Sequence, residues 1–129
     1  MGFNAIVTPD DLKKGELINP GWVPVEYVDY TEKEASTDAS TNIILTFKVL
    51  DGPFKGVTAN KLFNEKALGF GKALWPILGV PYEAEKGYAL NDQILKAKIG
   101  TKLQIYVARG ESNKGNAFND VKDFRPLSV

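Results

Sequence analysis

The chain has 129 residues, carries no formal net charge, and contains neither cysteine nor histidine. A chain of this length suggests one domain, residues 1–129, that buries a core without disulfides or metals. The absence of cysteine excludes a disulfide framework and a thiolate zinc site, and the absence of histidine removes the commonest general base. We therefore expect neither a metal nor another cofactor, and we expect that the protein is not an enzyme.

No run of apolar residues approaches the roughly 18 that a membrane span needs. Residues 1–14 lack the basic stretch followed by an apolar stretch that marks a signal peptide. We therefore expect a cytoplasmic protein that has no membrane partner.

Charge is distributed unevenly along this neutral chain. Residues 1–47 carry three basic and eight acidic residues, whereas residues 48–72 carry five basic and two acidic ones. Residues 96–114 carry five basic residues and one acidic one. The two basic segments either form one positive groove in the folded chain or remain two solvated faces that never meet. If a groove forms, we expect the acidic residues of the first segment to face away from it.

Residues 1–20 are predicted to form an N-terminal cap or extension. Thr8, followed by Pro9 and two acids, is typical of the start of a short helical turn, and Asn19-Pro20-Gly21 is a strong break. Trp22–Tyr30 is rich in β-branched and aromatic residues, which predicts a strand, and Pro24 within it indicates an edge or a bulge. A polar loop is expected over Thr31–Thr41.

The clearest strand is Asn42–Leu50, in which Ile43, Leu45, Phe47 and Val49 alternate with polar residues. Residues 51–56 predict a turn, and Val57–Phe63 predicts the returning strand of a hairpin.

A helix is predicted over Glu65–Leu78, with Asn64 as its N-cap and Gly79 as its C-terminal cap. Gly69, Gly71 and Pro76 weaken this helix. A second short helix is predicted over Asn91–Lys98.

The next strand begins after Gly100. Its apolar face is Leu103, Ile105 and Val107, and its opposite face is Lys102, Gln104 and Tyr106. Residues 109–116 predict a hairpin loop, and Ala117–Phe124 predicts the last strand.

Three strands, a helical insert and two further strands follow the order of an OB-fold. We therefore predict a mainly β fold, a five-stranded Greek-key OB-fold barrel with a helix between strands 3 and 4. Another small β-barrel or sandwich with one helix is the alternative architecture.

Short motifs of turn and core residues carry a similarity that covers roughly Asn19 to Pro126. They are Asn19-Pro20-Gly21-Trp22, Phe47, Gly52-Pro53-Phe54-Lys55-Gly56, Leu62-Phe63-Asn64, Leu78-Gly79-Val80-Pro81, Gly100-Thr101-Lys102-Leu103 and Asn119-Asp120-Val121-Lys122-Asp123-Phe124. With these motifs the chain resembles the small single-stranded DNA-binding proteins of bacteriophage replication modules.

This resemblance implies an OB-fold that coats single-stranded DNA during phage replication or recombination, in the host cytoplasm. It also implies phage or host replication and recombination proteins as partners. The chain departs from many single-strand binders because it ends in residues 124–129 without an acidic tail, so recruitment of partners through such a tail is not expected. The sequence leaves open whether the protein forms a homo-oligomer.

Binding a single strand without reading its sequence needs cations along the phosphates and aromatic rings under the bases. Tyr106 is the candidate ring, although it is equally well explained as a surface tyrosine covering the sheet. The candidate binding residues are Lys48, Lys55, Asn60, Lys61, Lys102, Gln104, Tyr106, Arg109 and Lys114.

The remaining aromatic residues are assigned mainly to the core. These are Trp22, Phe47, Phe54, Phe70 and Phe124. The sequence does not decide whether Trp75 is buried, or whether Trp22 or Tyr30 reaches the binding surface.

Two other functions compete with DNA binding. The neutral charge and the missing acidic tail favour a structural or protein-interaction β-barrel, such as a small virion component. A hydrolase that uses carboxylates alone ranks below both, because the acidic residues stand in polar loops as solvated surface groups do.

Overall fold

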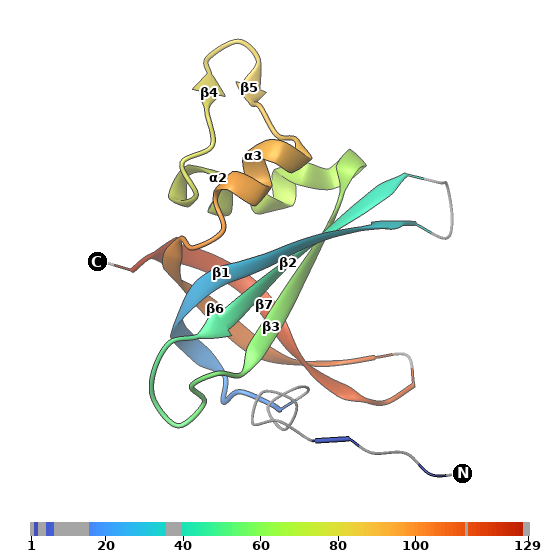
Figure 1. The fold of residues 1–129 in the computed structure, drawn as a ribbon. Helices are drawn as coiled ribbons and strands as arrows, with labels where there is room; N and C mark the ends of the chain where they lie inside the picture. Colours follow the sequence, from blue (N-terminus) through green and yellow to red (C-terminus); the bar gives the residue numbers. More distant parts are fainter. Residues whose placement is uncertain (1, 3–4, 7–15, 36–39, 113, 128–129) are drawn as a thin grey trace.

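Five long strands form one antiparallel sheet in the computed structural model, which describes residues 2, 5–6, 16–35, 40–112 and 114–127 (Figure 1). The strands are β1 (Gly21–Glu34), β2 (Thr41–Val49), β3 (Thr58–Asn64), β6 (Lys102–Glu111) and β7 (Ala117–Pro126). The chain is therefore mainly β, as expected. The helical turn expected near Thr8 lies outside the described residues.

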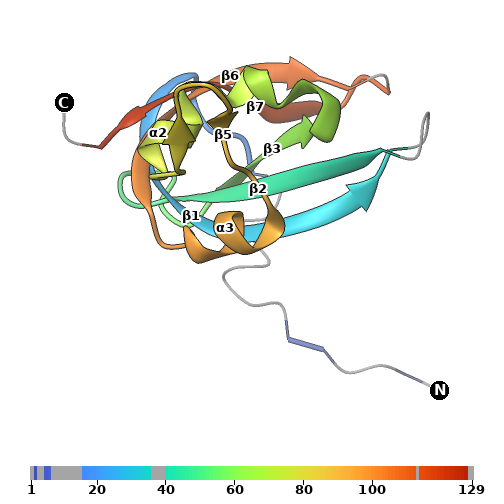
Figure 2. The same cartoon turned by 90° about the horizontal axis from the view of Figure 1, so that it is seen from above.

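The sheet has the strand order β3-β2-β1-β6-β7, so β3 and β7 are its two edges. The sheet curls until these edges approach each other (Figures 1 and 2). Asn119 of β7 places its Nδ2 atom 3.5 Å from the carbonyl oxygen of Thr58 in β3. No backbone ladder joins the two edges in the described part of the chain, so the sheet is not closed into a barrel.

The central strand β1 pairs with β6 over Gly21–Glu26 and with β2 from Val25 to Glu34. Pro24 was expected at an edge or a bulge, but it lies inside this central strand. Its carbonyl oxygen accepts a hydrogen bond from the backbone N–H of Leu50, just beyond the end of β2. The missing N–H of the proline would point to this same side, beyond the last pair of the β1–β2 ladder, Val25 with Val49, and the proline is tolerated there.

A bulge interrupts β1 at Val28, because Tyr27 pairs with Phe47 while Asp29 pairs with Thr46. Beyond the bulge the strand continues to Glu34. The polar loop expected from Thr31 therefore begins later, since its first residues extend the hairpin with β2. These residues need no apolar pattern because all four, residues 31–34, are exposed.

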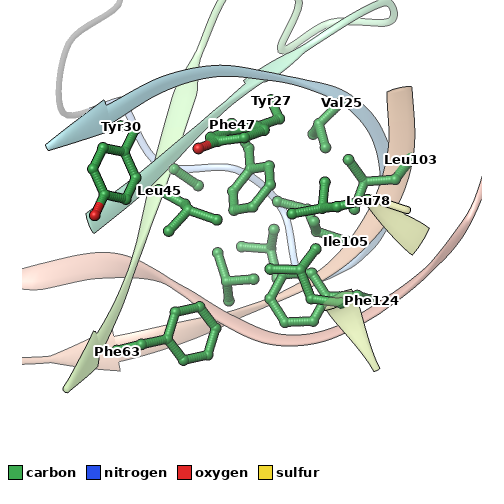
Figure 3. Packing of buried hydrophobic residues seen from close by; sticks show 14 of the residues in the cluster. Val25, Tyr27, Tyr30, Leu45, Phe47, Phe63, Leu78, Leu103, Ile105 and Phe124 are labelled. Atoms are coloured by element: carbon green, nitrogen blue, oxygen red, sulfur yellow. The ribbon is translucent and has the colours of Figure 1, made fainter. Parts of the chain in front are cut away.

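The buried face of the curled sheet confirms the alternation expected in β2 and β6 (Figure 3). The core includes Val25, Tyr27, Ile43, Leu45, Phe47, Val49, Leu103, Ile105, Val107, Val121 and Phe124. Ile18, in the expected N-terminal extension, also belongs to this core and is 1% exposed. Asn119 holds it there by accepting a hydrogen bond from the Ile18 N–H at 2.8 Å.

The connection between β3 and β6 covers one end of the curled sheet (Figures 1 and 2). It contains the 3-10 helix η1 (Glu65–Gly71), α2 (Leu74–Ile77), the small hairpin of β4 (Tyr82–Glu83) and β5 (Gly87–Tyr88), and α3 (Asp92–Ala97). The second predicted helix is confirmed as α3, and its cap Asn91 accepts a hydrogen bond from the Ile94 N–H at 2.8 Å. None of the helices in the described segments is long and apolar enough to cross a membrane.

The prediction of one continuous helix over Glu65–Leu78 is wrong. The chain instead forms η1, with non-helical backbone angles at Ala67, and then the single turn of α2. Two glycines and Pro76 lower the stability of a continuous helix, and tertiary packing replaces it.

Trp75 is the side chain around which this segment packs. It is 2% exposed, its ring centroid lies 5.1 Å from that of Phe63, and its Nε1 donates to the carbonyl oxygen of Leu68 at 2.9 Å. A Cβ atom added to Gly71 would lie 2.6 Å from Cε2 of this indole. Gly71 is therefore required where the chain passes directly over Trp75.

This contact predicts opposite effects for two alanine substitutions in η1. Gly71→Ala should lower the free energy of unfolding by about 1–3 kcal/mol, because the new methyl group overlaps the Trp75 ring. Gly69→Ala is the matched control, since a Cβ there meets no atom within 4 Å, and it should be neutral or stabilising by about 0.4–1 kcal/mol. Urea unfolding of both variants measures the difference, and equal midpoints would contradict the packing described.

Candidate nucleic-acid interface

The outer face of the sheet carries two aromatic rings side by side on β1 and β6. Trp22 and Tyr106 are cross-strand neighbours, and their ring centroids lie 5.5 Å apart in a T-shaped arrangement. Tyr106 is 37% exposed and Trp22 is half-buried. We call Trp22, Gln104, Tyr106 and Arg125 the outer aromatic cluster.

Arg125 of β7 completes this cluster and was missed in the sequence. Its guanidinium carbon lies 4.2 Å from the centroid of the Trp22 ring, and its Nε donates a hydrogen bond to Oε1 of Gln104. The signal that was available is its register, because Arg125 stands opposite Gln104 in the last hairpin. A planar cation stacked on an indole is held by cation–π attraction.

Trp22 is not a core residue, which corrects the expectation from its hydrophobicity. Val25 and Tyr27 face the core from β1, and successive side chains of a strand point to opposite faces. Trp22 therefore faces outward, on the same side as Tyr106. The other two undecided aromatic residues, Trp75 and Tyr30, are buried.

Lys102 and Lys48 lie on the same outer face as the cluster, but an acidic residue stands between them. Glu26 of β1 pairs with Lys48 on one side and with Lys102 on the other. The expectation that the acidic residues of 1–47 face away from the basic ones is therefore wrong for Glu26. The reason is topological, because β1 lies between β2 and β6 in the sheet.

The structure does not bring the other predicted residues to the outer aromatic cluster. Asn60 is exposed on β3, where its Oδ1 accepts a hydrogen bond from Thr46 Oγ1 at 2.9 Å. Lys61 faces the side of β3 that carries Phe63, and its Nζ lies 5.8 Å from the centroid of that ring. Both lie on an edge strand, two strands away from β1.

Three cations lie in turns or at the end of a strand. Lys55 and Lys114 are exposed in the turn after β2 and in the loop between β6 and β7. The Arg109 side chain turns toward the N-terminal segment, with its Nη2 3.4 Å from the carbonyl oxygen of Ile18. The Arg109 guanidinium is therefore hydrogen-bonded to the backbone at residue 18.

Phe47 and Phe124 are buried as predicted, and Phe54 is half-buried against the core. Phe70 was also assigned to the core, and that prediction is wrong because the side chain is 83% exposed. The helical spacing on which the assignment rested does not exist once η1 replaces the continuous helix.

A cavity of about 300 Å³ lies between the end of β1, η1 and α3, and three carboxylates line it. Glu32 accepts a hydrogen bond from the Tyr30 hydroxyl, Glu65 accepts one from the Thr41 N–H, and Asp92 pairs with Lys96. Each of the three carboxylates therefore already has a hydrogen-bond or ion-pair partner within the protein. In the segments that the structure describes, no group of three acidic side chains is placed to hold a metal ion.

Burial raises the pKa of two core tyrosines. Burial is the main cause of the raised pKa of Tyr27, and the negative charge of Asp29 raises this pKa further. Burial is also the main cause of the raised pKa of Tyr30. Its hydrogen bond to Glu32 and the negative charge of Glu32 raise this pKa further. The Tyr27 hydroxyl donates to the carbonyl oxygen of Leu95 at 2.9 Å, so it joins β1 to α3 only in its neutral form.

These raised pKa values predict alkaline unfolding. An unfolded tyrosine ionises near pH 10. The contribution of the two neutral hydroxyls to the free energy of unfolding is therefore fully present below about pH 10 and is lost as pH rises above it. We expect tyrosinate absorbance and loss of circular dichroism to rise together. Tyr30→Phe should lose less free energy of unfolding than the wild type between about pH 9 and pH 11. Equal losses would contradict this account.

The family model described as "Protein of unknown function (DUF669)" matches residues 7–129. No curated protein gives a significant match to the chain. The matched range includes all five long strands and the whole connection between β3 and β6. Because the match extends over nearly the entire sequence, the chain belongs to the DUF669 family.

Proposed function

We propose that the protein binds single-stranded DNA, largely without sequence specificity, through the outer face of its sheet. The observation that carries this proposal is the outer aromatic cluster, in which Trp22 and Tyr106 lie side by side with Arg125 against the indole. In this proposal the protein protects strands exposed during phage DNA replication or recombination, in the host cytoplasm. Replication and recombination proteins are the partners it would meet there.

The cluster combines the two contacts that single-strand binding needs. A base that stacks on an aromatic ring contributes about 1–3 kcal/mol, and it does so for any base because every base has a flat face. Arg125 offers a planar cation, and Lys102 lies two residues from Gln104 on the same face of β6. Both cations can contact phosphates while Tyr106 and Trp22 hold bases.

We also propose that the curled sheet is an OB-type barrel left open between β3 and β7. Its first strand pairs with the second and the fourth of the five long strands, and the helical connection stands between the third and the fourth. This arrangement supports the proposal, since OB-folds are partly open five-stranded barrels that bind oligonucleotides. In that reading the predicted residues Lys48 and Asn60 lie at the margin of the same outer face.

One observation favours the competing function, a protein-interaction module. The β4–β5 hairpin projects away from the sheet beyond α3 (Figure 1). It carries Tyr82, which is 62% exposed, with its ring centroid 4.9 Å from that of Tyr88. An exposed tyrosine on a projecting hairpin, supported by the partly buried Tyr88, is a suitable anchor for a partner protein. The proposal includes no catalytic activity, and turnover of DNA by the pure protein would argue against it.

Titration of fluorescent oligo-dT at two salt concentrations tests the proposed function. Tyr106→Ala should weaken binding by about 1–3 kcal/mol and leave the salt dependence nearly unchanged, because stacking releases no counterions. Lys102→Ala combined with Lys48→Ala should weaken binding and flatten the salt dependence. Lys86→Ala in the β4–β5 turn is the matched control, since it removes a cation that is exposed and away from this face.

The comparison with duplex DNA provides the contradicting outcomes. Bases must leave their stack to reach Tyr106, so the single strand should bind far more tightly than the duplex. Equal affinity for the two would show that stacking is not the contact. Binding to neither at low salt would overturn the nucleic-acid function and favour the protein-interaction module.

A further inference from the structure

Phe70 presents an aromatic ring to solvent in the connection between β3 and β6. The side chain is 83% exposed. Burial of a phenylalanine side chain contributes about 1.5–3 kcal/mol to the stability of a folded protein. The exposed Phe70 ring does not make this contribution. Neither the core nor the outer aromatic cluster accounts for a ring in this position.

The turn that carries Phe70 is held firmly from below. Gly71 lies directly on the Trp75 ring, whose Nε1 donates to the carbonyl oxygen of Leu68 at 2.9 Å. The Lys72 N–H donates to the carbonyl oxygen of Gly69 at 3.1 Å. These contacts fix the residues on both sides of Phe70, and its ring therefore points outward because of the packing beneath it.

The surroundings of the ring are basic and sterically open. Phe70 lines a shallow depression together with Lys66, Ala67, Gly69 and Lys72. Glycines on both sides of Phe70 carry no side chains that would cover the ring. Among the residues that the structure describes, no carboxylate lines the depression, and the neighbouring Glu65 accepts a hydrogen bond from the Thr41 N–H.

We infer that Phe70, with Lys66 and Lys72, forms a second stacking point for single-stranded nucleic acid, separate from the outer aromatic cluster. An accessible ring between two cations suits a base and its flanking phosphates. This inference rests on the proposed function. A protein partner fits less well, because a stable protein interface buries about 800 Å² on each side, whereas one ring is enough for a base.

Titration of the full chain with long oligo-dT and with an abasic strand of equal length tests the inference. Phe70→Ala should weaken binding to oligo-dT roughly 5- to 150-fold, the equivalent of about 1–3 kcal/mol. Its affinity for the abasic strand should stay unchanged, since that strand offers phosphates and no bases. Phe70→Tyr should bind oligo-dT as the wild type does.

Two controls separate the ring from general effects. Thermal unfolding of Phe70→Ala should match the wild type, because the side chain is exposed. Tyr82→Ala removes another exposed ring, on the β4–β5 hairpin, and should bind oligo-dT normally.

The outcomes distinguish this inference from the proposed function. If Phe70→Ala binds oligo-dT normally while Tyr106→Ala binds it weakly, the second stacking point is wrong, the proposed function stands, and Phe70 is left for a protein contact. An equal loss on oligo-dT and on the abasic strand also overturns the inference, because stacking would not be the contact. If the wild type does not bind oligo-dT, both proposals fail.

Discussion

The β1 strand is hydrogen-bonded along both of its edges, to β6 near its start and to β2 over its later part. The bulge at Val28 lies just beyond the end of the ladder with β6. At this point the backbone of Tyr27 still bonds to Gly100 and Thr101 ahead of β6, while its hydroxyl bonds to the carbonyl oxygen of Leu95 in α3. One buried residue thus joins the sheet to the connection that covers it.

The position of β1 also determines which charges meet on the outer face. Because β1 lies between β2 and β6, Glu26 separates Lys48 from Lys102, and the two basic segments do not merge into one uninterrupted patch. The same register places Trp22 beside Tyr106 and brings Arg125 to the indole across β6. The outer face therefore offers aromatic rings with cations around them, which suits stacking better than attraction by charge alone.

The strands were predictable where one face is buried, since Ile43–Val49 and Leu103–Val107 alternate in the sequence as they do in the sheet. The connection was not, because Gly71 and Pro76 stop a continuous helix and Trp75 then decides where Phe70 points. Within the candidate site, alternation placed Tyr106 on the outer face. The same alternation in β1 places Trp22 on the outer face. The contact of Arg125 with the indole depends on β1 and β7 lying on the two sides of β6, which no local pattern specifies.

The indole of Trp22 allows a direct test of the claim that bases stack on the outer face. Trp22 lies in the outer aromatic cluster, beside Tyr106 and against Arg125. We predict that addition of oligo-dT shifts the indole N–H resonance of Trp22 in an NMR spectrum. A saturating titration in which the Trp22 resonance does not move would contradict the account.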